Sequence, residues 1–92
     1  MASNLLIFFM EFIGTFIFIY IVLKYQEPIP CGLAFTGLLY FNRITNGTYN
    51  PASSIAKYLN QEIDTQRFIW FICGQVLGAF GAYYLFKNIN ED

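Results

Sequence analysis

The chain is short and apolar: of its 92 residues 57% are hydrophobic and 12% are charged, the net charge is −1 and the mean hydropathy is +0.47. This composition is typical of a membrane protein rather than a soluble domain, and the few scattered Lys and Arg residues offer no basic surface for nucleic acid.

Histidine is absent, which removes the usual general base and the commonest metal ligand. We therefore expect no enzyme, no catalytic residues, no metal centre and no cofactor. The two cysteines, Cys31 and Cys73, lie in different apolar segments without metal-ligand spacing, and this pattern predicts small buried packing residues.

The first segment expected to cross a membrane covers residues 5–23. It reads LLIFFMEFIGTFIFIYIVL, which contains a single charge, and a helix of that length covers roughly the 30 Å of a hydrocarbon core. A cleaved signal peptide is the alternative. The spanning helix is favoured because no Lys or Arg precedes Lys24 and because the apolar run is too long for the core of a signal peptide.

A second apolar segment, IPCGLAFTGLLYFNR at residues 29–43, follows a short turn. It is rich in small residues and short for a full span, and we expect it to be the second membrane helix.

The third expected span covers residues 68–86 and reads FIWFICGQVLGAFGAYYLF. Arg67 and Lys87 flank it, and aromatic residues near its ends are typical of interfacial anchors. Gly74, Gly78 and Ala82 recur at intervals of four residues, a pattern that lets two helix backbones approach closely. We expect these three residues to pack against another helix.

Between the second and third segments lies a polar, turn-forming run, TNGTYNPASSIAKYLN, at residues 45–60. Asn50 followed by Pro51 is a helix-start signal and predicts a helix over about 51–59, roughly 13 Å long and too short to span. One interpretation is an amphipathic surface helix, although its small residues differ from the large apolar groups of an interfacial anchor. The favoured interpretation is a re-entrant half-helix. Its approach loop must then be buried in protein or line a water-filled cavity.

Three stretches together resemble the aquaporin and glycerol-facilitator (major intrinsic protein) family. GTYNPA at 47–52 resembles the family's asparagine-proline-alanine box, MEFIGTFIF at 10–18 its first helix, and GQVLGAFGA at 74–82 its third helix, with Gly74 in place of an alanine. Their order and spacing agree with the first half of the family over about residues 5–87. The resemblance implies an all-α membrane fold in which residues 1–92 form a single domain: three transmembrane helices and one re-entrant half-helix, half of an inverted-repeat bundle.

The resemblance also implies roles for individual residues. The carboxamide of Asn50 faces the lumen and donates to a passing water or hydroxyl oxygen, with Pro51 and Ala52 completing the box. Glu11 accepts hydrogen bonds from loop N–H groups around residues 45–49, and Gln75 supports the same loop. A protonated buried acid stays open as an alternative for Glu11, and a helix-packing hydrogen bond for Gln75. The candidates for lining the pore or its filter are Gly47, Thr48, Ser53 and Phe35.

The sequence departs from the family pattern in several places. The family joins two halves in one chain and carries two boxes, whereas these residues hold one. Ser53 stands where the family's second box precedes an arginine, and Arg43 and Thr48 stand where histidines are usual. The segment 33–35 lies about five residues nearer the box than its family counterpart, which leaves the filter role of Phe35 open.

We expect a passive channel for water or small neutral solutes such as glycerol, and the positive end of the half-helix dipole agrees because it orients water and disfavours cations. The channel would need at least two copies, or one copy and a separately encoded half. The alternative is a non-conducting remnant or a regulatory subunit of a full-length relative. A cation channel is disfavoured because no carboxylate or carbonyl-rich filter is evident near the box.

Three spans predict an integral, multi-pass membrane protein in contact with lipid, with its termini on opposite sides. Arg43, Lys57 and Arg67 would lie at the aqueous rim on one side, and Lys24 and Lys87 on the other. Three cations against two give a weak orientation bias. We therefore expect a homo-oligomer: an antiparallel dimer within a tetramer of pores, in which two Asn50 side chains meet at mid-membrane. A separately encoded second half is the alternative partner.

Overall fold

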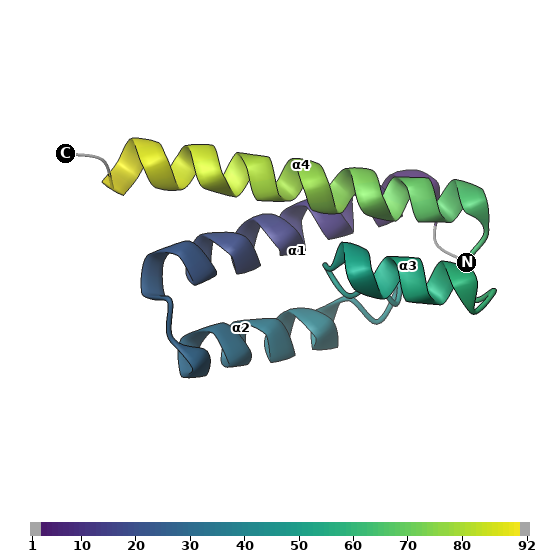
Figure 1. Cartoon of the computed structure of the whole chain (residues 1–92), viewed down its shortest axis with the longest axis horizontal. Coiled ribbons are helices and arrows are strands. Elements are labelled where there is room, and N and C mark those ends of the chain that lie inside the picture. The colour runs from purple at the N-terminus through teal and green to yellow at the C-terminus, as the bar shows by residue number, and fades with distance from the viewer. Residues whose placement is uncertain (1–2, 91–92) are drawn as a thin grey trace.

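The structure is a computed structural model that describes residues 3–90, so residues 1, 2, 91 and 92 of the expected domain lie outside the described residues. The described residues fold into four α-helices and contain no strand. The helices are α1 (Asn4–Tyr25), α2 (Pro28–Phe41), α3 (Pro51–Leu59) and α4 (Thr65–Asn90), as Figure 1 shows.

Local capping signals set the ends of α1. The hydroxyl oxygen of Ser3 accepts from the N–H of Leu6 at 3.1 Å, which satisfies one of the free donors of the first turn. At the other end Gln26 takes a left-handed conformation with φ 52°, and its N–H donates to the carbonyl of Val22 at 3.1 Å. Residues 26 and 27 then connect directly to Pro28, the first residue of α2.

Helices α1 and α4 are long and apolar enough to cross a membrane. Helix α2 is also apolar, but it is too short to count as a spanning helix. The expected span at 68–86 is part of a longer helix, because the carboxylate of Asp64 accepts from the N–H of Arg67 at 2.8 Å and starts α4 three residues earlier. Helix α2 has 14 residues, about 21 Å, and is thus shorter than a hydrocarbon core. Length and composition therefore support two of the three expected spans.

Helices α1 and α4 run in the same direction and pack tightly through the small residues of α4 (Figure 1). A Cβ atom on Gly74 would lie 2.7 Å from the carbonyl oxygen of Phe8, and one on Gly78 would lie 2.7 Å from that of Phe12. Ala82 is fully buried. The backbone of α1 therefore lies directly on the row of small residues, where larger side chains would not fit.

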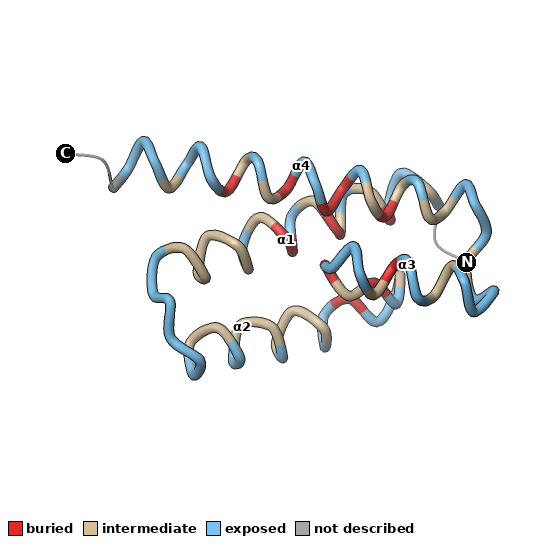
Figure 2. The backbone as a smooth tube through the Cα atoms, in the orientation of Figure 1, coloured by how far each residue is buried: buried red, intermediate tan, exposed pale blue. Residues whose placement is uncertain are grey.

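The shorter helices attach to this pair by fewer contacts. The ring of Tyr58 on α3 stacks on that of Phe68 on α4 at 4.7 Å, and the rings of Phe18 on α1 and Phe35 on α2 lie 5.1 Å apart. Helix α2 has no buried residue. Figure 2 shows buried residues where α1, α4, the start of α3 and the loop before it meet, while α2 carries none.

The interior contains several polar side chains beside apolar ones such as Ile7 and Phe71, and much of the exterior is apolar. The buried side chains include Glu11, Thr15, Asn42, Ser54 and Gln75, whereas large apolar side chains such as Ile29 (73% exposed) and Phe41 (76% exposed) lie on the surface. Exposed apolar surface of this extent marks contact with lipid or with another protein. The predicted burial of the cysteines is wrong for Cys73, which is exposed on α4, and Cys31 is half-buried.

Candidate functional site

A buried carboxylate, Glu11 on α1, is the centre of the buried polar side chains. Its oxygens accept from three N–H donors: the side-chain amide of Asn42 at 2.5 Å, the backbone N–H of Tyr49 at 3.0 Å and the side-chain amide of Gln75 at 2.8 Å. Glu11 is 0% exposed, so these bonds offset the cost of removing the carboxylate from water. The carboxylate thus joins α1, α4 and the loop that precedes α3.

Gln75 extends this network to α3. Its amide nitrogen donates both to Glu11 and to the hydroxyl of Ser54 at 2.9 Å. Because its two hydrogens are used in this way, Gln75 holds the first turn of α3 against α1 and α4. Gln75 therefore makes hydrogen bonds between helices, and its predicted support of the loop at 45–49 stays a prediction.

Asn42 is a member of the network that no sequence motif predicts. This residue follows the end of α2 and is 1% exposed. Besides donating to Glu11, its side-chain oxygen accepts from the hydroxyl of Thr45, and its carbonyl accepts from the N–H of Asn46 at 2.9 Å. Asn42 therefore shapes the turn over residues 42–46. The one sequence signal was an amide placed directly after an apolar run.

Two glycines let the loop lie close to α1. A Cβ atom on Gly47 would overlap the carboxylate of Glu11 and lie 2.8 Å from the amide nitrogen of Asn42. A Cβ atom on Gly14 would overlap the ring of Tyr49. Each glycine thus leaves space for a side chain of the other segment. A larger residue at either position would force that side chain to move.

The start of α3 presents the carboxamide of Asn50. Asn50 caps the helix, and its side-chain oxygen accepts from the N–H of Ala52 at 2.9 Å, while Pro51 is the first helical residue. This bond uses the side-chain oxygen of Asn50 and leaves its N–H₂ group free of the helix cap. Within residues 3–90 the N–H₂ group has no acceptor, and the Asn50 side chain is exposed.

A cleft of about 360 Å³ lies beside this amide group. Of the residues proposed to line a pore, Phe35 borders this cleft, whereas Gly47 is buried against Glu11. Thr48 and Ser53 do not line it, and the hydroxyl of Thr48 is buried without a partner among the described residues. The lining residues are Phe18, Ile19, Phe35, Tyr49, Asn50 and Pro51.

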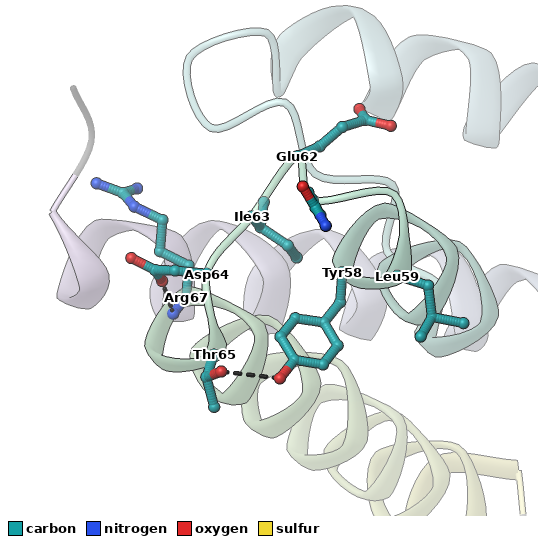
Figure 3. Close-up of a pocket in the computed structure, with 8 residues that line it drawn as sticks. Tyr58, Leu59, Glu62, Ile63, Asp64, Thr65 and Arg67 are labelled. Atoms are coloured by element: carbon teal, nitrogen blue, oxygen red, sulfur yellow. Dashed lines mark hydrogen bonds between the residues drawn. The ribbon is translucent and has the colours of Figure 1, made fainter.

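The far end of α3 is polar. Figure 3 shows Tyr58, whose hydroxyl bonds that of Thr65 at 2.8 Å across a pocket of about 640 Å³ formed with the turn before α4. Lys57, which the sequence analysis placed at the aqueous rim, donates to the carbonyl of Asn46 at 2.5 Å and so ties the loop to α3. No cluster that could hold a metal ion is found among residues 3–90.

The chain is similar in sequence to the glycerol uptake facilitator protein-like 6 of Lactiplantibacillus plantarum, with 31% identity over 88 residues. The match covers 85% of this chain and 41% of that protein, so the chain spans less than half the length of this relative. No model of a known protein family matches the chain, and no solved structure matches it. The similarity to a facilitator and the two long apolar helices suggest a membrane protein.

Proposed function

We propose that this chain forms part of a passive channel for water or small neutral solutes such as glycerol, of the aquaporin and glycerol-facilitator type. The observation that carries the proposal is the free N–H₂ group of Asn50 at the start of α3, beside a cleft of about 360 Å³. In this proposal α1, α2 and α4 cross the membrane and α3 is a re-entrant half-helix. The similarity to a glycerol uptake facilitator supports it.

The chemistry of the cleft suits the passage of a neutral solute. Asn50 donates one hydrogen bond to a water or hydroxyl oxygen, while Phe18, Ile19 and Phe35 offer apolar walls that bind it weakly. The N-terminal end of α3 carries roughly half a positive charge, which repels cations. The network around Glu11 holds the donor in place, because it fixes the loop immediately before Asn50.

A second unit is needed to close this cleft into a lumen. The cleft is open on the described residues, and α2 also exposes large apolar side chains away from it, with Leu33 69% exposed and Tyr40 69% exposed. We propose that a second copy in the opposite orientation, or a half of the same kind in another polypeptide segment, covers the cleft. Four such pores would form a tetramer, with lipid against the remaining apolar faces.

The second candidate function is a non-conducting subunit that regulates a full-length relative. The length of α2 favours it, because 14 helical residues reach only about 21 Å and leave one wall short of the hydrocarbon thickness.

Swelling of proteoliposomes, followed by light scattering, separates these functions. We compare the wild type with Asn50→Leu, which removes the donor at similar volume, and with Asn60→Leu, which makes the same change at the other end of α3. If the chain forms a channel, we expect water and glycerol fluxes to fall towards the lipid background in Asn50→Leu and to stay at the wild-type value in Asn60→Leu. Background flux in the wild type, both alone and together with a separately encoded half of the same kind, would instead favour the non-conducting subunit.

A further inference from the structure

Tyr49 is the residue that separates the clefts of the site. It is 5% exposed and borders three of them: the cleft of about 360 Å³ at Asn50, one of about 370 Å³ at Gln75 and one of about 250 Å³ between Gly14 and Leu38. One aromatic ring therefore forms a wall common to three spaces.

The same residue connects α1 to α2. Its ring lies against Gly14 of α1, and its hydroxyl donates to the carbonyl of Leu38 on α2 at 2.8 Å. Its backbone has φ 58°, which bulky residues rarely adopt, and its N–H is fixed by Glu11 at 3.0 Å. A strained residue held in this way serves as a rigid spacer between the two helices.

Contacts other than those of Tyr49 also hold α2 against α1: Asn42, directly after α2, donates its side-chain amide to Glu11 at 2.5 Å. Helix α2 has no buried residue, and its ring contact with α1 is that of Phe35 with Phe18. Tyr49 nevertheless lies between Gly14 of α1 and Leu38 of α2, so the size of the side chain at residue 49 contributes to the spacing of the two helices there.

We propose that Tyr49 is the specificity-determining residue of the channel: it sets the width of the cleft at Asn50 and closes the side that faces the cleft at Gly14. This inference rests on the proposed channel function. Loss of the ring would join the two clefts, and the larger opening would help glycerol more than water, because water is already small enough to pass.

The test is the ratio of glycerol to water permeability in proteoliposomes. Asn tolerates a positive φ, so Tyr49→Asn removes the ring without forcing the backbone to change. We expect Tyr49→Asn to raise the ratio severalfold and Tyr49→Phe, which keeps the ring, to leave it close to the wild-type value. Tyr40→Asn, on the exposed surface of α2, is the matched control.

A second variant moves the same ring without removing it. The new methyl group of Gly14→Ala would overlap the Tyr49 ring and push it towards the cleft, so we expect a lower ratio. The same substitution should have no effect on the ratio in a Tyr49→Asn background, because the ring is then absent. Gly14→Ala in the wild-type background keeps the inference testable if Tyr49→Asn inserts poorly.

An unchanged ratio in both Tyr49→Asn and Gly14→Ala, with flux still lost in Asn50→Leu, would overturn the role of Tyr49 and leave the channel function standing. Background flux in a wild type that inserts in both orientations would overturn both. The spacing itself is measured by spin labels at Ile17→Cys and Leu33→Cys after Cys31 and Cys73 are replaced by Ser. An α1 to α2 distance that does not respond to Tyr49→Asn would contradict the spacer role.

Discussion

At the scale of single residues, the site depends on a balance of donors around one buried acceptor. Each contact of Glu11 is an N–H group that donates to a carboxylate oxygen, and the donors come from Asn42, Tyr49 and Gln75. A buried carboxylate is costly unless it is fully hydrogen-bonded, so the three donors and the acceptor need one another. The loop conformation therefore depends on the two acceptor oxygens of the Glu11 side chain as well as on its shape.

Replacing this acceptor should destabilise the fold. Glu11→Gln keeps the shape but puts an N–H₂ group where at least one N–H donor now points, which leaves buried donors unpaired and costs about 1–3 kcal/mol. The free energy of unfolding in mixed micelles, followed by the loss of helical circular dichroism, measures this change.

Glu27→Gln is the matched control, because Glu27 is exposed before α2 and its side chain makes no capping bond. Equal stability of the two variants would show that the network does not hold the loop.

Sequence reasoning could find some members of this site and not others. Glu11 and Gln75 stand out because polar side chains inside apolar segments need partners, and both lie in the network, although their roles in a pore stay predictions. Asn42 was missed because an amide at the end of an apolar segment also reads as an ordinary helix end. Tyr49 was missed because its position depends on a left-handed backbone that a tyrosine does not suggest.

At the scale of the helices, local sequence signals predict where a helix starts or ends. Contacts with residues far away in the sequence can change these limits. The start of α3 at Pro51 follows from the Asn50 cap, which is a local contact. The end of α2 lies at Phe41 rather than at residue 43, because Asn42 turns its side chain to Glu11, far away in the sequence. Propensity alone contains no information about that second kind of contact.

The row of small residues on α4 allows a stability prediction. The Cβ atom of Gly78→Ala would lie 2.7 Å from the carbonyl of Phe12, so the α1 and α4 backbones must separate, which costs about 1–3 kcal/mol. Gly32→Ala on α2 is the matched control, because its Cβ would meet nothing within 4 Å, and alanine's helix preference should stabilise it by up to about 1 kcal/mol.

Thermal unfolding in one detergent, with both variants side by side, measures the difference. A Gly78→Ala protein as stable as Gly32→Ala would contradict close packing of α1 on α4.

At the scale of the whole molecule, the structure has several polar side chains in its interior, a largely apolar exterior and ends that face opposite ways. The start of α1 and the end of α4 lie at opposite ends of the molecule, as Figure 1 shows. Lys57 near the end of α3 and Arg67 near the start of α4 lie towards the side where α1 begins, and Arg43 follows the end of α2. Lys24 and Lys87 lie towards the other side, so the cations that orient a membrane protein are almost evenly divided.

This near balance predicts that the chain inserts in both orientations, which an antiparallel pair of identical copies requires. Orientation is read by labelling Asn88→Cys from each side of sealed membranes, in a chain whose Cys31 and Cys73 are replaced by Ser. We expect comparable labelling from both faces. The control variant is Lys24→Gln combined with Lys87→Gln, which leaves all cations on one side and should insert in a single orientation.

Loss of solute flux in that control variant would then follow from the loss of the opposed partner, because no residue near Asn50 has changed. Mixing the control with wild-type copies, some of which insert in the opposite orientation, should restore part of the flux. If instead the wild type itself labels from one face only, two identical copies cannot face each other. A different unit must then supply the second half-helix, and the flux of this chain alone should equal that of the lipid.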